Sequence, residues 1–357
     1  MALNKKFFTT GGIVASSPTE GALDPLQNFE TVTYTGNGST QSITSLDFQP
    51  DLVWIKQRSA AGNHSIFDSV RGVQKYLLSN STVQETDYSG DNGVTSFDSN
   101  GFTVDDTGGI DYSVNHSGTY VSWCWKAGGA AVSNTDGTIT SQVSANQAAG
   151  FSIVKYTGNA TNGATIGHGL SSAPELIIIK NLIDAENWSV YSSPTGNTQV
   201  GHINLTNAFS ATGDWNNTTP TTSVFTVGTS NRVNTTDNFI AYCFHSVDGY
   251  QKIGSYTPTT GDDVVTLGFR PRFVMLKRAT GGTGNWEIHD GTRYPSIYTD
   301  TGESRRLRAN TPDAEAQFTD SPINFTDTGF VLDSSVTGDS YGDYDANGST
   351  YIYLAIA

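Results

Sequence analysis

The sequence predicts an all-β protein of three tandem β-sandwich domains, jelly-roll or lectin-like in type, that arose by internal duplication and follow an extended N-terminal arm. Three observations support this. A proline followed by one charged residue, four apolar residues and a lysine occurs three times, at 50–56, 174–180 and 271–277. Thr, Val, Tyr and Phe, which favour strands, are frequent, whereas only 15% of the residues are charged. Asn-Gly and Asp-Gly pairs, which suit hairpin turns, recur along the chain.

The repeat extends well beyond the proline segment. An upstream hairpin, a Trp or His segment, a Leu and Asn segment, a strand pair and a closing apolar strand accompany it in the same order each time. The Trp or His segments are 63–68, 187–192 and 285–290, and the closing strands are 120–125, 239–244 and 351–356. Six landmarks in a constant order indicate that a whole domain was duplicated.

These landmarks set the expected boundaries. Residues 1–27 form the N-terminal arm, and the sandwich repeats occupy 28–128, 136–247 and 248–357. A length near 100 residues with about eight strands suits a sandwich. We expect 127–134 to be a short linker and the brief junction at 245–249 to be stiffer.

Individual strands follow from hydrophobic patterning. The runs 52–55 and 176–179 are apolar throughout, which predicts central strands that are buried on both faces. Cys124 and Cys243 occupy equivalent positions in two closing strands. Equivalent positions in separate domains lie too far apart for a disulfide, so we expect buried free thiols and folding in a reducing cytoplasm.

Charge and hydropathy exclude several partners. The chain has 34 acidic and 19 basic residues, a net charge of −15, which argues against binding to nucleic acid. No apolar run approaches the roughly 20 residues of a membrane span, so no membrane partner is expected. The N-terminus has two lysines, but 9–12 interrupt the apolar stretch that a secretion signal needs.

The acidic residues do not form an expected catalytic pair. Glu287 and Asp290 could be compared with the paired carboxylates of glycosidases, but a spacing of three places them on opposite faces of a strand. An Asp-x-x-Arg pattern begins at Asp68 and at Asp290, whereas the second repeat has Ser192 and Thr195 instead. A local salt bridge explains this pattern better than catalysis does. We therefore expect no catalytic residues, no enzyme activity and no cofactor.

Metal and sugar sites are also not expected. The six histidines lack metal-ligand spacing, and the Asp-rich segment 339–345 lacks the order of an EF-hand, so a solvated loop is favoured over a calcium site. Trp54, Trp188 and Trp286 could stack on sugars. Trp188 and Trp286 occupy matching positions, with His64 in the first repeat, and a residue matched between repeats favours packing. Ligand-binding residues are not identified.

The repeats resemble a family of proteins encoded by tailed bacteriophages, especially marine and cyanobacterial phages, described as tail-fibre-like, concanavalin-A-like or uncharacterised virion proteins. The opening 5–12 also looks like the start of such proteins. The family brings no agreed catalytic residues. The matching segments are 34–38, 67–72, 122–129, 150–159, 167–170, 241–244 and 268–272.

The resemblance implies a virion structural protein, made in the host cytoplasm: a tail fibre or spike that contributes to adsorption on the host. A capsid decoration protein or head spike is the alternative, and a glycan-binding lectin or a depolymerase is the alternative of another class. Expected partners are tail or capsid components and host surface glycans, in a homo-oligomer, specifically a trimer. Lys5, Lys6, Phe7 and Phe8 are the candidates for virion attachment, with a disordered leader as the alternative.

Overall fold

The computed structural model describes residues 23–88, 92–107, 114–299, 304–318, 322–333 and 341–357. These residues form strands almost exclusively, so the predicted all-β class is confirmed. The helical elements are short: η1 (Pro25–Gln27), η2 (Pro295–Tyr298) and α1 (Tyr341–Tyr344). Within the described ranges, no helix has the length and apolar character needed to cross a membrane.

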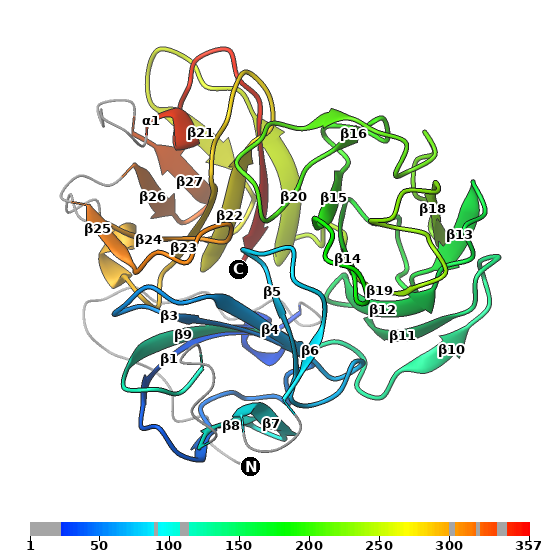
Figure 1. Ribbon diagram of the computed structural model, residues 1–357. Helices are drawn as coiled ribbons and strands as arrows, with labels where there is room; N and C mark the ends of the chain where they lie inside the picture. Colours follow the sequence, from blue (N-terminus) through cyan, green and yellow to red (C-terminus); the bar gives the residue numbers. More distant parts are fainter. Residues whose placement is uncertain (1–22, 89–91, 108–113, 300–303, 319–321, 334–340) are drawn as a thin grey trace.

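Each repeat contributes one large antiparallel sheet (Figure 1). In the first, the strand order is β1 (Phe29–Gly36), β9 (Gly118–Trp125), β3 (Leu52–Gln57), β4 (His64–Asp68), β5 (Lys75–Leu78) and β6 (Thr86–Asp87). The third has the same order: β20 (Gln251–Tyr256), β28 (Tyr351–Ile356), β22 (Phe273–Arg278), β23 (Trp286–Asp290), β24 (Ser304–Arg308) and β25 (Ala316–Phe318).

The large sheet of the second repeat differs at its edges. Its order is β10 (Val132–Asn134), β11 (Ser141–Asn146), β12 (Phe151–Thr157), β19 (Asn238–Phe244), β14 (Leu176–Asn181) and β15 (Ser189–Ser192). The proposed linker 127–134 therefore contains a strand of this sheet. The second repeat begins earlier than residue 136, because β10 pairs with β11.

A smaller sheet lies beside each large one. The three sets of strands are β2 (Gln41–Ile43), β8 (Gly101–Asp106) and β7 (Asn92–Asp98); β13 (Ala164–Gly167) and β18 (Val224–Val227); and β21 (Asp263–Thr266), β27 (Gly329–Leu332) and β26 (Ile323–Thr326). A separate pair is formed by β16 (Gln199–Val200) and β17 (Ser210–Ala211).

The register of the central strands is the same in all three repeats. The pairs Trp54 with Trp123, Ile178 with Tyr242 and Met275 with Leu354 occupy equivalent places. Each closing strand lies between two neighbours, so its backbone groups are paired on both sides. This common register places the repeats in correspondence residue by residue.

The central strands separate two hydrophobic cores. Leu52 and Trp54 belong to a central cluster to which all three repeats contribute. Val53 and Ile55 belong to a peripheral cluster made by the first repeat alone. The other two repeats have corresponding peripheral clusters of their own. The prediction that 52–55 and 176–179 are buried on both faces is confirmed.

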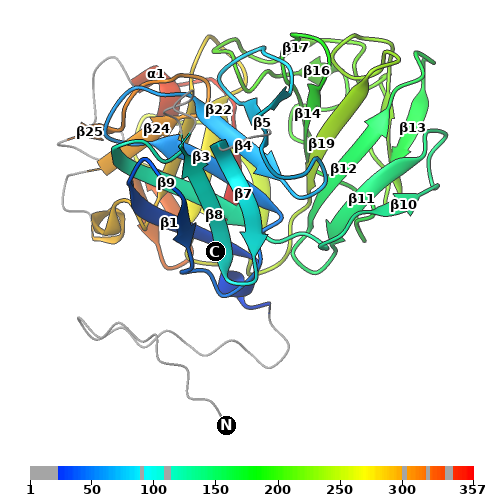
Figure 2. The ribbon, with the colours of Figure 1, turned by 60° about the horizontal axis from the view of Figure 1, so that its bottom comes forward.

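The three large sheets surround the central cluster in a pseudo-threefold arrangement (Figure 1). The first repeat lies at the bottom of that view, the second at the right and the third at the upper left. Figure 2 shows the same body turned, with the first repeat in front. The repeats thus form one closed body around a shared core instead of a row of separate domains.

Candidate functional site

The contacts between repeats are the most distinctive chemical feature of the molecule. We call the contact of repeats 1 and 2 interface A, that of repeats 2 and 3 interface B, and that of repeats 3 and 1 interface C. Equivalent backbone hydrogen bonds cross all three: Glu85 N to Leu182 O at A (3.1 Å), Phe209 N to Ala279 O at B (2.9 Å) and Glu315 N to Arg58 O at C (2.9 Å).

A second ring of contacts starts at the Trp or His position. The Trp188 indole donates to the carbonyl of Leu78 across interface A (3.0 Å), and the Trp286 indole donates to the carbonyl of His202 across interface B (2.9 Å). At interface C the equivalent residue is His64. Burial and then the charge of Lys56 lower the pKa of His64, and the nearby backbone of Arg308 partly opposes this shift. The Nε2 atom of His64 makes no hydrogen bond of standard geometry.

These contacts give the recurring tryptophans a role. Trp188 and Trp286 are fully buried, and Trp54 is nearly so. The indole nitrogen of Trp54 donates to His64 Nδ1 (2.9 Å). The preference for packing over sugar stacking is therefore confirmed for all three.

The Asp-x-x-Arg pattern forms the predicted local salt bridge and also reaches the next repeat. At interface A, Asp68 accepts from the Arg71 guanidinium and from the Tyr242 hydroxyl, the latter at 2.8 Å. At interface C, Asp290 accepts from Arg293 and from the Trp123 indole, the latter at 3.0 Å.

Interface B lacks every part of this arrangement. The equivalents of Asp, Arg and the aromatic donor are Ser192, Thr195 and Leu354. Leu354 has no donor, so a carboxylate at position 192 would lack the partner that its equivalents have. The acid, its arginine and the donor from the adjacent repeat therefore occur together at interfaces A and C and are all absent at interface B.

Interface C has the densest charge network. Glu315 accepts from Arg58 (2.9 Å), Arg293 (3.1 Å) and Arg305 (3.0 Å). Burial opposes ionisation of Glu315, but its bond to Arg58 and the nearby arginine charges keep its pKa below the usual value. This interface joins the first repeat to the last without a direct chain connection, so backbone and side-chain contacts together close it.

Glu287 and Asp290 face opposite sides of β23, as predicted. Asp290 points to interface C, whereas Glu287 accepts from the Tyr344 hydroxyl (3.0 Å) and from Arg308 (2.8 Å). Burial raises the pKa of Glu287 to about 7, against the charges of Arg306 and Arg308. Glu287 is fully buried, so a substrate could reach it only if the surrounding chain moved.

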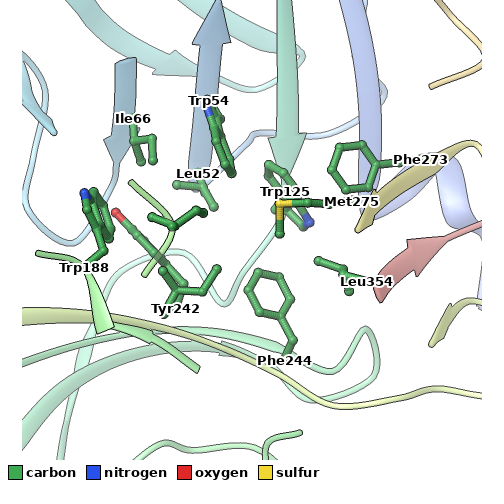
Figure 3. A pocket seen from close by; sticks show the side chains of 12 residues that line it. Leu52, Trp54, Ile66, Trp125, Trp188, Tyr242, Phe244, Phe273, Met275 and Leu354 are labelled. Carbon is green, nitrogen blue, oxygen red and sulfur yellow. The ribbon is translucent and has the colours of Figure 1, made fainter. Parts of the chain in front are cut away.

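A small cavity lies at the centre of the shared core (Figure 3). Its volume is about 20 Å³, and it is lined only by apolar surface. Side chains from all three repeats point toward one another around it, including Trp54, Tyr242 and Met275. The space is large enough for one water, but its lining offers no polar partner for one, so it is a packing defect of the apolar core.

Two larger hollows lie at the surface. One, of about 370 Å³, is lined by residues of the third repeat that include Arg270, Tyr298 and Asp327. The other, of about 360 Å³, is lined mainly by the second repeat, including Lys155 and Asn238. Both are lined by more polar and charged side chains than apolar ones.

The remaining predicted residues have different outcomes. The virion-attachment candidates Lys5, Lys6, Phe7 and Phe8 lie outside the described residues. Cys124 and Cys243 are buried free thiols, as predicted, and burial raises the pKa of each. The described ranges contain no cluster of three or more His, Cys, Asp or Glu residues suited to a metal ion.

Comparison with known proteins identifies one family. Residues 24–357 match the model of a family described as "Domain of unknown function (DUF7483)". The chain belongs to this family. The match covers all three repeats. No curated protein and no solved structure matches the chain.

Proposed function

We propose that the protein is a structural component of a bacteriophage virion, a tail fibre or spike that contributes to adsorption on the host surface. The proposal rests on the resemblance of the repeats to virion proteins of tailed phages. The structural observation that supports it is the closure of three repeats into one body. Hydrogen bonds to ionised side chains cross interfaces A and C, and such bonds are stronger than those between neutral groups.

Several parts of the proposal concern how the body is used. The repeats act as three β-sandwich-like units, and 1–27 with Lys5, Lys6, Phe7 and Phe8 attaches them to other virion proteins. The surface hollows meet host glycans. The chain assembles as a homotrimer. A capsid decoration protein or head spike is the alternative within this class.

Immunogold labelling of purified virions with antibody against the full-length recombinant protein tests the location. Gold at the tail is the expected result. Gold over the head would favour the decoration protein or head spike. Unlabelled virions, with a positive signal for a known capsid protein in the same preparation, would refute a virion role.

A glycan-binding lectin or depolymerase is the candidate of another class, and the hollow beside Tyr298 supports it. A guanidinium lies over this ring, since Arg270 is 5.2 Å from its centroid. A depolymerase would shorten host envelope polysaccharide incubated with the purified protein. A lectin would bind the polysaccharide without shortening it.

A further inference from the structure

One buried carboxylate in the third repeat lacks the partners that similar groups have. Asp345, directly after α1, is 2% exposed. Of the carboxylates in the described ranges, it alone has both oxygens buried without a hydrogen-bond partner. Asp68 and Asp290, by comparison, accept from arginines and aromatic donors. An ionised carboxylate in this situation is strongly unfavourable.

The groups around Asp345 make its ionisation still less favourable. Burial, then the side chain of Asp263 at the start of β21, and then the charges of Asp262 and Asp333 raise the pKa of Asp345 above its usual value. Tyr256 also faces this cluster. The side chains of Asp263 and Asp345 lie within hydrogen-bonding range, yet two ionised carboxylates have no proton to share. Either a proton or a cation therefore has to lie between them.

The surrounding chain holds the two carboxylates in place. Asp263 accepts from the backbone N–H and the hydroxyl of Thr259, at 2.9 and 3.0 Å. The residues on either side of Asp345 are also fixed: the carbonyl of Tyr344 accepts from Tyr256 (2.8 Å), and the N–H of Ala346 donates to Tyr351 (3.0 Å). The carboxylate pair is thus preorganised, which favours ion binding.

We propose that Asp263 and Asp345 bind a hard divalent cation of the Ca²⁺ type, with Asp262 and Asp333 adding negative potential. Carboxylate oxygens are the ligands that such cations prefer, and zinc is disfavoured because no His or Cys takes part. Two carboxylates leave the remaining coordination to backbone carbonyls and water. We therefore expect weak affinity, with a dissociation constant of about 10⁻⁴ to 10⁻³ M, as in extracellular calcium modules. This site revises the solvated loop expected at the end of 339–345 and does not depend on the proposed virion role.

The test uses the full-length protein stripped with chelator at pH 7.5. We expect Ca²⁺ at about 10 mM, a saturating level for this affinity class, to raise the melting temperature of the wild type. Asp345→Asn should abolish this response, and Asp47→Asn should retain it because Asp47 is an exposed residue of the first repeat. Tb³⁺ should give luminescence on tyrosine excitation that Ca²⁺ displaces.

A shared proton predicts the opposite pattern. The melting temperature of the wild type would then not respond to Ca²⁺, and Tb³⁺ would give no luminescence. The absence of the Ca²⁺ response or of the Tb³⁺ luminescence would overturn the proposal. If Asp345→Asn fails to fold, Asp263→Asn and the Tb³⁺ titration of the wild type decide the question in its place. Unchanged luminescence with Asp263→Asn would also overturn the proposal.

Discussion

The hydroxyl of Tyr242 offers a direct test of how the repeats are joined. It donates to Asp68 Oδ2 across interface A at 2.8 Å, and both side chains are buried. Tyr242→Phe removes this hydroxyl and keeps the ring. Asp68 retains the Arg71 guanidinium and the backbone N–H groups of Val70 and Arg71. The variant therefore measures the bond between repeats separately from the salt bridge.

A hydrogen bond to a charged group contributes about 1.5–3 kcal/mol. Because Asp68 keeps its other donors, we expect a loss near the lower limit, about 2 kcal/mol in the free energy of unfolding. The control is Tyr156→Phe, whose hydroxyl donates at 2.7 Å to the carbonyl of Val233 within the second repeat. A neutral bond of this kind contributes about 1 kcal/mol.

Urea unfolding of the full chain, followed by tryptophan fluorescence, supplies both free energies. The expected result is a larger loss for Tyr242→Phe than for Tyr156→Phe, with equal urea dependence in the two variants. A loss for Tyr242→Phe that is equal to the control or smaller would refute the reasoning. It would mean that Arg71 alone satisfies Asp68 and that the bond between the repeats contributes nothing further.

Three further outcomes are expected. Folding raises the pKa of Glu287 from 4.5 to about 7, so protonated Glu287 stabilises the fold at low pH and this contribution is lost as pH rises from 4.5 to 7. In urea titrations, the free energy of unfolding of Glu287→Gln should therefore rise relative to that of the wild type by on the order of 1–3 kcal/mol between pH 4.5 and 8. A difference that does not change with pH would contradict this. Glu315→Gln removes the acid from the buried network and should lower the free energy of unfolding by about 3 kcal/mol. Glu85→Gln, at the equivalent position with fewer arginine partners, should lower it by less than about 1 kcal/mol, and equal losses would argue against the network. Since the three repeats share a core, calorimetry should show one transition with equal calorimetric and van't Hoff enthalpies, and separate transitions would indicate independent domains.

Local features of the fold follow from the sequence because they depend on local patterns. The uninterrupted apolar run 52–55 predicts a strand that is buried on both faces, and the spacing of Glu287 and Asp290 predicts side chains on opposite faces. Both predictions are confirmed. Alternation along a strand determines which side chains point the same way, whatever the tertiary arrangement.

The sequence pattern does not reveal which part of the molecule a buried strand packs against. The pattern at 52–55 shows that both faces are buried, but not that one of them is buried against other repeats. Hydrophobic periodicity records burial and carries no information on what provides it. The same reason explains the linker expected at 127–134, since its polar and small residues suit either a linker or the edge strand β10.

One sequence signal could have revealed the closed arrangement. Asp68 accepts a hydrogen bond from Tyr242, and Asp290 accepts one from Trp123. Each donor is an aromatic residue of an adjacent repeat. Where the acid becomes Ser192, the corresponding donor becomes Leu354. Treating the three repeats as a small internal alignment, and pairing each with its neighbour in cyclic order, exposes this correlation. Tandem domains without contact would not need it.

The differences between the interfaces follow the course of the chain. Interfaces A and B join repeats that are consecutive in sequence, so the effective concentration of their surfaces is high before any contact forms. Interface C joins the first repeat to the last, and closing that long loop costs more conformational entropy. It is also where Glu315 meets three arginines and where Arg293 lies over the Trp123 ring at 5.5 Å. Interface B has no Asp–Arg pair, and the short junction at 245–249 connects its repeats. Among the described residues, the ion pair that joins two repeats, Arg58 with Glu315, thus occurs where the chain itself contributes least to holding the repeats together.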